Sequence, residues 1–589
     1  MRRLEQIEPW LWGFAFSTIA FAQALWDWDK AGWGDWGQFH HWWEVGRVAI
    51  LRHGEFPLWD PHHCGGVSMW GQPQSQHLAP TWWVTGLAFG TVAGHKLFIL
   101  LHSAAGFAGM VRLARRYYGL RTEAAYLAAI TFAFSGFFAW RAAGGHSTFL
   151  GFLYLPWIFY FWRKTNDDVR YAGGVAGLMA LTLLEGGTYP FPLIFLLLAF
   201  DFCAQLLRWR PRWAVIRTGL ITGTLTAMIG AIRLWPVYLT MSRFPRNTEM
   251  EDSQTFEEVL HSLTARAPHD WYFGHRWVWA EYSAHIGWVI IGLSALGALV
   301  ALRPRARLGY LVAGALVFTL CAMGNVAPHY PWPLLHELPL YENFHVPSRF
   351  HVLVTFYLCL LAALALDRWL DATTKITKRR WTRRIPVALA WLVVLGAGGE
   401  VISNSAVIAN RWDGREIYGV TEDNFHLVGP AGYLDQYMSY PLRNVGTRAC
   451  YDPVPWTISP ALWVGDQPQA RIDPRGTGEV TGWGRTNHTL WAEVTLTEPG
   501  RVVFNQNYDP DWRVSVGEAA EDDHHRLVVD LPAGTHRVDA WFAPSDLPWS
   551  IVVCLAGILL SLLLLLASPL RLARLRRSTS RRRLGNRGR

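Results

Sequence analysis

Residues 549–569 read WSIVVCLAGILLSLLLLLASP and include no charged side chain. An α-helix of this length is about 30 Å long, which matches the hydrocarbon core of a bilayer. Working outward from this segment, apolar blocks of about 18–22 residues recur along the chain. The sequence therefore predicts a polytopic α-helical membrane protein.

The apolar blocks predict twelve membrane helices. They lack the strict alternation of apolar and polar residues that outer-membrane barrel strands need, which excludes a barrel. The predicted helices cover residues 10–26, 92–111, 122–140, 147–162, 171–187, 189–207, 214–235, 285–302, 308–324, 350–367, 385–403 and 549–569.

The composition excludes several other classes of protein. Hydrophobic residues make up 51% of the 589 residues and charged residues only 17%, whereas soluble proteins carry roughly 25% charged residues. A soluble cytosolic enzyme and a disordered chain are therefore excluded. Six cysteines in a chain of this length are also too few for a disulfide scaffold.

The net charge of +9 follows from membrane topology and does not indicate a nucleic-acid partner. If the N-terminus is cytoplasmic, the short inner loops and tail hold 32 of the 54 Lys and Arg residues. This is the distribution of the positive-inside rule. The first helix is then an uncleaved anchor, both termini are cytoplasmic, and the basic tail 570–589 lies near anionic lipid.

The remaining segments predict a domain organisation around the membrane part. Residues 1–403 form a multi-pass module with outer loops 27–91, 241–284 and 325–349, and residues 404–548 form an outer domain. Alternation and turn signals in the outer domain predict an antiparallel β-sandwich. Its predicted strands are Trp491–Leu496, Arg501–Asn507, Trp512–Val516, Leu527–Leu531 and His536–Phe542.

The first outer loop holds the densest cluster of ionisable groups, beginning at Asp35. Residues 38–53 predict a helix in the membrane interface, with Asp35 at or just before its N-terminus. A carboxylate at that point has two interpretations. It caps the helix, or it is a functional group placed where burial has a cost. Position alone does not decide between them.

Cysteine and histidine residues of the same loop raise the question of a metal. His62, His63, Cys64 and His77 offer zinc ligands, but their spacing matches no standard finger. No metal ligand is therefore assigned, and a divalent metal stays an open option. Cys64 and Cys450 are the only cysteines predicted to lie outside, so the sequence leaves a disulfide between them undecided.

Several ordered motifs resemble the YfhO-like family of bacterial membrane proteins. In the first outer loop these are Gly34-Asp35 followed by Gln38, then Gly-Glu-Phe-Pro-Leu-Trp-Asp-Pro at 54–61, Gly65-Gly66 and Pro73-Gln74. Nearly the whole chain is covered, because further matches are Phe132–Phe137, His146, Tyr154–Trp157, Phe344–Phe350, Tyr508–Arg513 and Leu531–His536.

That family is similar to the C-type glycosyltransferases, and the resemblance implies a reaction. Such enzymes take a sugar from a polyprenyl-phosphate carrier and transfer it on the non-cytosolic side of the membrane. The acceptor would be an envelope glycan, a teichoic-acid-like polymer or a glycolipid. Asp35 matches the acidic residue of the first outer loop, which acts on the acceptor or helps to hold the donor.

Glycosyl transfer needs a base near the acceptor hydroxyl and positive charge near the departing phosphate. Arg349 is the preferred phosphate ligand, with Arg233 and Arg141 as further candidates, although Arg349 could instead pair with an acid such as Glu342. His146 could orient Asp35 or donate to phosphate. The other candidates are Glu185, at the outer end of a helix, Gln38, and Asp60, for which a turn role before Pro61 is preferred.

Three functions are compatible with these observations, and the transferase is preferred. A flippase for lipid-linked sugars would show inverted repeats and ionisable groups at mid-membrane, and neither is clear. A non-enzymatic envelope assembly protein would tolerate neutral substitution of Asp35. No Walker or Rossmann motif appears in a convincing context. The sugar, the acceptor and the stereochemical outcome are not given by the sequence.

Overall fold

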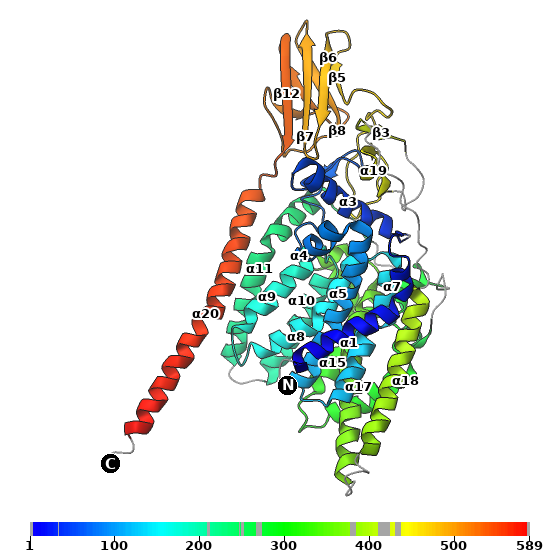
Figure 1. Ribbon diagram of the computed structural model, residues 1–589, viewed down its shortest axis with the longest axis vertical. Coiled ribbons are helices and arrows are strands. Elements are labelled where there is room, and N and C mark those ends of the chain that lie inside the picture. Colours follow the sequence, from blue (N-terminus) through cyan, green and yellow to red (C-terminus); the bar gives the residue numbers. More distant parts are fainter. Residues whose placement is uncertain are drawn as a thin grey trace.

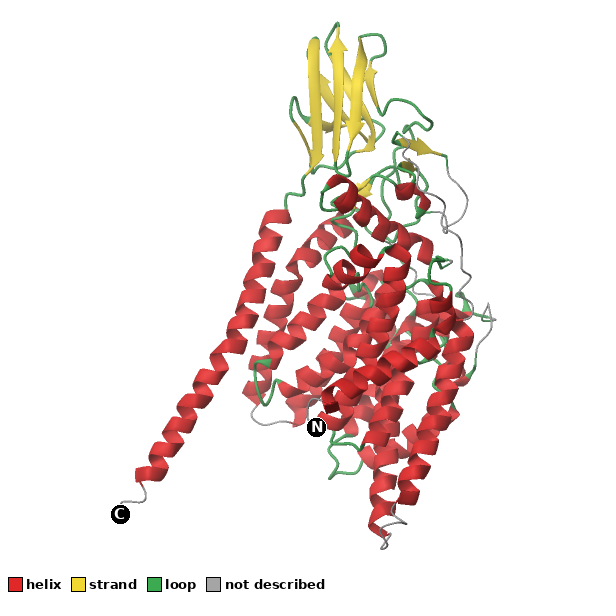
Figure 2. Cartoon of the chain, viewed as in Figure 1, coloured by secondary structure: helices red, strands yellow, loops and turns green. Residues whose placement is uncertain are grey.

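The computed structural model is a helical bundle that carries β-sheets at one end (Figures 1 and 2). Parts of the predicted loop 241–284, of the outer domain and of the basic tail lie outside the described residues. The structure describes residues 4–32, 34–208, 212–246, 248, 252–266, 272, 274–376, 384–409, 424–429 and 437–585.

A helix lies on each of the twelve predicted ranges, which confirms the polytopic helical class. Several ranges are broken or shared by two helices. The helices are α1 (Leu4–Ala20) with α2 (Ala22–Trp26), α5 (Thr91–Arg112), α6 (Thr122–Ala133) with α7 (Gly136–Gly144), η3 (Ser147–Tyr154) with α8 (Leu155–Lys164), α9 (Tyr171–Leu184), α10 (Pro190–Arg208), α11 (Arg212–Arg243), α14 (Trp288–Ala301), α15 (Gly309–Ala322), α17 (His351–Ile376), α18 (Arg384–Ala409) and α20 (Leu547–Gly585).

Within the described residues, seven helical stretches are long and apolar enough to cross a bilayer, by length and composition. Three more apolar helices, α9, α14 and α15, have 14 residues each. The predicted range 147–162 is interrupted because its first half is a 3-10 helix, which ends beside Pro156. The twelve predicted helices thus differ more in length than the apolar blocks indicate.

Further helices fill the connections, all of them short except α3, and many of them lie at the sheet-bearing end. They are α3 (Trp36–His53), α4 (Pro80–Trp82), η1 (Trp83–Leu87), η2 (Leu113–Tyr117), α12 (Phe256–Thr264), α13 (Trp279–Tyr282), α16 (Pro331–His336), η4 (Tyr341–Asn343), η5 (Pro347–Phe350) and α19 (Ser439–Leu442).

Helix α17 is the buried centre of the bundle and packs against α14, α6 and α15. Close approach to α14 requires a glycine, because a Cβ at Gly297 would collide with the carbonyl oxygen of Leu361. Ser294 adds a hydrogen bond of 2.8 Å to the Leu358 carbonyl. By contrast, α18 and α20 expose leucine side chains such as Leu392, as expected for helices that face lipid.

The predicted β-sandwich is confirmed. Two four-stranded antiparallel sheets, of order β10-β11-β8-β5 and β6-β7-β12-β9, share one hydrophobic core. The sequence missed three of the eight strands: β6 is rich in glycine, and β5 and β10 are very short. The strands are β5 (Ala470–Asp473), β6 (Gly478–Arg485), β7 (Thr489–Leu496), β8 (Gly500–Asn507), β9 (Trp512–Val514), β10 (Ala519–Glu521), β11 (Arg526–Leu531) and β12 (Gly534–Phe542).

The β-sandwich rests on the segment that follows α3. Trp59 inserts into the sandwich core, with its ring centroid 5.1 Å from that of Trp512 and 4.7 Å from that of Phe542. The same segment forms a small hairpin, β1 (Trp59–Asp60) with β2 (Val67–Ser68). A parallel pair, β3 (His426–Val428) with β4 (Val445–Thr447), lies beside it.

Candidate functional site

Asp35 directly precedes α3, but its side chain does not cap that helix. No cap hydrogen bond forms. Instead, Nε2 of His146 lies 2.7 Å from Oδ2 of Asp35, and the Tyr451 hydroxyl donates to Oδ1 at 3.1 Å. The capping interpretation of Asp35 is therefore not what the structure shows.

A glycine brings together the two segments that carry Asp35 and His146. Gly145 has a φ of +93° and approaches the backbone of Trp36 so closely that a Cβ would collide with it. Only glycine combines this left-handed conformation with that approach. His146 follows directly and therefore faces Asp35.

Hydrogen bonding sets the charge state of Asp35. Burial acts to raise the pKa of this carboxyl group, but the hydrogen bonds from His146 and Tyr451 outweigh it and hold the pKa below its ordinary value. Arg141 donates to Nδ1 of His146 at 2.7 Å. Because a guanidinium only donates, it selects the tautomer of His146 whose Nε2–H faces Asp35.

Two arginines and one glutamate extend this chain of contacts. Glu281, on α13, lies 2.7 Å from Arg141 and accepts two hydrogen bonds from Arg349, at 2.8 and 3.1 Å. The two cations hold the pKa of Glu281 well below its ordinary value, although burial opposes them. Arg349 also lies over the ring of Tyr189, 4.2 Å from its centroid. Its acidic partner is thus Glu281, and not Glu342.

All of these groups except Arg141 line one cavity of about 1050 Å³. An apolar part is supplied by α10, α11 and α20, and a polar part by the connections at the sheet-bearing end. The polar part includes Asp35, Gln38, Gln74, His146, Arg246, Glu281, His345, Arg349, Tyr451 and Asp452. The cavity therefore joins several carboxylates, two arginines and an apolar wall.

The rim of the cavity holds strained backbone. Leu340 and Val346 have φ values of +78° and +60°, a region that is unfavourable for residues other than glycine and most of all for a β-branched one. They flank Phe344 and His345, which line the cavity. Such strain is characteristic of functional segments that their surroundings hold in place.

Four of the predicted site residues, Asp35, Gln38, His146 and Arg349, line this cavity. The candidate Arg141 does not line it and instead bonds to His146 and Glu281. Three further candidates do not line it either, and the first is Arg233. It is buried in α11 and donates to the carbonyl oxygens of Trp70, Gln72 and Ser75 at 2.9–3.2 Å. Its guanidinium thereby fixes the segment that leads to Gln74.

Glu185 is the second of these three candidates. It is fully buried and accepts hydrogen bonds from Thr81, His102 and Tyr154 at 2.7–2.9 Å. The next residue, Gly186, packs against the backbone of Gln74. Glu185 therefore supports the cavity wall from behind.

Asp60 is the third. Its Oδ2 lies 2.7 Å from Nε2 of His41, and its Oδ1 accepts from the backbone N–H of His62 at 2.9 Å. Burial opposes ionisation of this pair, but their attraction prevails, so the pKa of Asp60 is lowered and that of His41 is raised. Asp60 thus forms the predicted turn and also a buried ion pair.

Sequence reasoning missed several polar residues of the cavity, and four of them matter for its chemistry: Arg246, Glu281, Tyr451 and Asp452. Arg246 is the least constrained of them, because no hydrogen bond or ion pair reaches its guanidinium from the part of the chain that the structure describes. None of the four belongs to a motif used above. The one available signal was the position of Tyr451 and Asp452 directly after Cys450.

Cys64 and Cys450 form the disulfide that the sequence left undecided. Two groups among the described residues lie at metal-ligand distances, namely His63, Cys64 and Cys450, and His41, Asp60 and His63. The disulfide leaves the first group no thiolate for a metal, so only the second is a chemically complete set of donors. His62 and His77 of the zinc hypothesis belong to neither group. Nδ1 of His62 faces the Val445 carbonyl, and Nε2 of His77 faces the Trp42 carbonyl.

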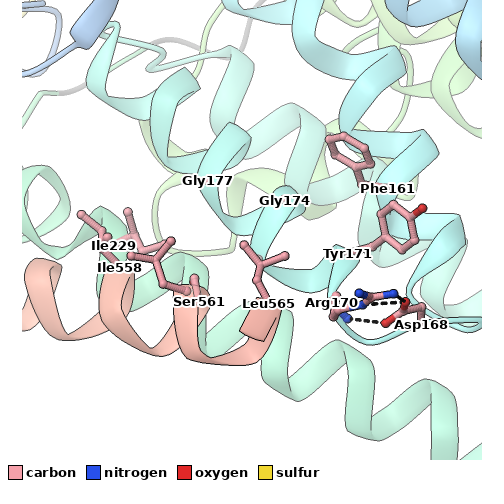
Figure 3. Close-up of a pocket in the computed structure, with 12 residues that line it drawn as sticks. Phe161, Asp168, Arg170, Tyr171, Gly174, Gly177, Ile229, Ile558, Ser561 and Leu565 are labelled. Atoms are coloured by element: carbon pink, nitrogen blue, oxygen red, sulfur yellow. Dashed lines mark hydrogen bonds and ion pairs between the residues drawn. The ribbon is translucent and has the colours of Figure 1, made fainter. Parts of the chain in front are cut away.

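A second cavity, of about 580 Å³, lies between α9 and α20 (Figure 3). Gly174 and Gly177 of α9 face Ser561 and Leu565 of α20 across it. It contains none of the predicted site residues. Its charged edge is closed by an ion pair between Arg170 and Asp168.

Fold and site together define a polytopic helical membrane protein whose polar cavity lies at the sheet-bearing end of the bundle. No protein-family profile and no curated protein matches the chain. Among solved structures, it is similar to the arabinofuranosyltransferase AftD from Mycobacteria, at 17% identity over 69% of this chain and 27% of that one, with a TM-score of 0.45.

A further similar structure is the oligosaccharyltransferase of Archaeoglobus fulgidus in its apo form. Identity is 11% over 76% of this chain and 65% of that one, with a TM-score of 0.46. This chain thus spans about a quarter of the first protein's length and just under two thirds of the second's.

Proposed function

We propose that this chain is a membrane glycosyltransferase. It moves a sugar from a polyprenyl-phosphate carrier to an envelope glycan, a teichoic-acid-like polymer or a glycolipid at the outer face of the bacterial cytoplasmic membrane. The observation that carries the proposal is that an ionised carboxylate, Asp35, lines the same cavity as Arg349 and Arg246. The resemblance of the motifs around Asp35 to the YfhO-like family supports the same reaction.

The apolar part of the cavity suits a prenyl chain. Trp235 and Tyr238 of α11 and Trp549 of α20 line it, and they are also 41%, 61% and 39% exposed at the bundle surface. Side chains that are both cavity lining and bundle surface mark an opening toward lipid. The donor therefore enters sideways from the bilayer, and its phosphate stays at the polar end.

In this mechanism Asp35 is the general base. It takes the proton of the acceptor hydroxyl as that oxygen attacks the anomeric carbon of the sugar. The bond from the anomeric carbon to the phosphate oxygen breaks, and prenyl phosphate departs with the electron pair. Arg349 and Arg246 stabilise the negative charge on the departing phosphate. His146 and Tyr451 hold Asp35 in position.

A flippase for lipid-linked sugars is the second candidate. Glu185, His102 and Tyr154 form a buried polar group inside the bundle, and ionisable groups at such depth often mark transport pathways. A flippase would not need Asp35 as a base. A substitution of Asp35 therefore separates the two functions.

The test compares lipid-linked sugars and envelope glycans by mass spectrometry in a deletion strain. The strain is complemented with the wild-type chain, with Asp35→Asn or with the control Asp523→Asn, an exposed aspartate of the sandwich. Loss of a general base lowers transfer by about 10²–10⁴-fold. We expect the glycan to disappear and the donor to accumulate in the deletion strain and with Asp35→Asn only.

Equal membrane levels of all variants are confirmed first. Full restoration by Asp35→Asn would contradict the base mechanism and favour the flippase or an assembly role. A deletion strain with unchanged lipids and glycans would contradict the transferase itself.

A further inference from the structure

The segment Cys450–Pro453 reaches the cavity from the sheet-bearing part of the molecule. Tyr451, Asp452 and Pro453 line the cavity. The Tyr451 hydroxyl donates to Asp35, and its main-chain carbonyl accepts from the side-chain amide of Gln38. The segment thus covers Asp35, although the two are separated by 416 positions in the sequence.

Covalent and main-chain contacts hold this segment in place. The disulfide joins Cys450 to Cys64, and the Cys64 N–H donates to the carbonyl of Ala449 at 3.2 Å. The Tyr451 N–H donates to Nε2 of His63 at 3.2 Å. The segment is therefore a fixed part of the cavity wall.

Asp452 offers a carboxylate without a cationic partner. The amide of Gln72 donates to both of its oxygens, at 2.8 and 2.7 Å, and the Val454 N–H donates to Oδ1 at 2.9 Å. No ion pair to it is found within the described ranges. Burial raises its pKa to about 7. Since each carboxylate oxygen has two acceptor positions, Oδ2, which accepts from Gln72, has a second position that the nearby Trp456 indole or a ligand hydroxyl can take.

Charge is distributed unevenly around the cavity. Asp35 and Asp452 make one wall acidic, and the amides of Gln38 and Gln74 complete it with uncharged groups. Neither carboxylate makes a hydrogen bond or ion pair to an arginine among the residues that the structure describes. Carboxylates and amides suit the hydroxyl groups of a sugar and repel an acidic one.

We propose that the segment Cys450–Pro453 is the sugar-recognition wall of the cavity, and that Asp452 selects a neutral or amino sugar over one that carries a carboxylate. This inference rests on the proposed function, because it takes the cavity to bind a prenyl-phosphate sugar. The sugar hydroxyls contact Asp452, while the phosphate lies with Arg349 and Arg246.

The test measures binding to the purified full-length chain at pH 8. The probes are farnesyl phosphate and its esters with glucose, glucuronic acid, galactose and galacturonic acid. The glucose ester is compared with the glucuronic acid ester, and the galactose ester with the galacturonic acid ester. For at least one of these two pairs we expect the neutral ester to bind at least tenfold more tightly than the uronic ester. Asp452→Asn should reduce this ratio below threefold, while Asp452→Glu and the exposed control Asp466→Asn should keep it.

The results distinguish a failure of the sugar-recognition wall from a failure of the proposed function. Equal affinities for the neutral and uronic esters, or esters no tighter than farnesyl phosphate, would overturn the sugar wall and leave the proposed function standing. An unchanged ratio in Asp452→Asn would also overturn it. If farnesyl phosphate and all esters fail to bind, the proposed function fails as well. The Asp452→Glu comparison guards against a folding defect, because both variants replace the same half-buried side chain.

Discussion

At the scale of single residues, Asp35 is held from two sides by groups that come from distant parts of the chain. His146 and Tyr451 each occupy one carboxylate oxygen. Hydrogen bonds to a carboxylate favour its ionised form. The pKa of Asp35 is lowered, so its base form is complete at neutral pH and is lost only when the pH falls through that lowered value.

His146→Phe should move the acidic limb of the activity profile to higher pH. The substitution removes a hydrogen bond that lowers the pKa of Asp35 and leaves the burial that raises it. We expect the acidic limb of kcat/KM to rise by about one pH unit or more, since one unit corresponds to about 1.4 kcal/mol of differential interaction. Proteoliposomes supplied with lipid extract of the deletion strain provide the assay.

His146→Gln keeps an N–H donor and should restore much of the wild-type profile, and the exposed His524→Phe is the control. An acidic limb that stays in place in His146→Phe would show that His146 does not set the charge of Asp35.

At the scale of elements, the short helix α13 joins three parts of the bundle. Glu281 on α13 pairs with Arg141 of α7 and with Arg349 of η5. Its backbone carbonyl also accepts from Ser348 at 2.9 Å. A buried carboxylate between two buried cations leaves both charges uncompensated when it is removed.

Glu281→Gln should therefore destabilise the protein by about 3–5 kcal/mol, the usual cost of breaking a buried ion pair. A lower unfolding temperature of the detergent-purified protein would report it. The exposed Glu337→Gln is the matched control and should unfold like the wild type. A Glu281→Gln protein with unchanged stability would show that solvent reaches and screens the two arginines.

At the scale of the whole molecule, the β-sandwich and the bundle share hydrophobic core. Trp59, from the segment after α3, is almost completely buried among Trp512 and Phe542 of the sandwich. The sandwich is also fixed to the bundle by α20, which packs on α11 (Figure 1). The two parts are therefore one mechanical unit.

Trp59→Ala should weaken the packing of the β-sandwich against the bundle. Truncation of a buried tryptophan costs about 3–5 kcal/mol. We expect limited proteolysis to cleave the Trp59→Ala protein between bundle and sandwich well before the wild type. Trp541→Ala removes a partly exposed indole from β12 and should leave the cleavage rate unchanged. Equal resistance of both variants would place the stabilising contacts elsewhere.

The sequence predicts this fold better than the site, for physical reasons. Apolar blocks and alternation are local patterns, so the helices and five of the strands follow from them. Arg233 and Glu185 show the limit for the site. A charge within a membrane helix needs a partner, but the sequence does not say whether that partner is a substrate, a carbonyl oxygen or a histidine. Glu281 and Asp452 have no local pattern at all, since their partners are distant in sequence.

The distance along the chain between Asp35 and Tyr451 has a consequence for biosynthesis. Asp35 leaves the ribosome among the first residues, whereas Cys450 and Tyr451 follow only after most of the bundle has been made. Until then no wall stands opposite Asp35, and the cavity is incomplete. A chain whose translation stops early, or that loses its last quarter to a protease, carries Asp35 without Tyr451 and Asp452. If the proposed function holds, such a chain would not consume the lipid donor.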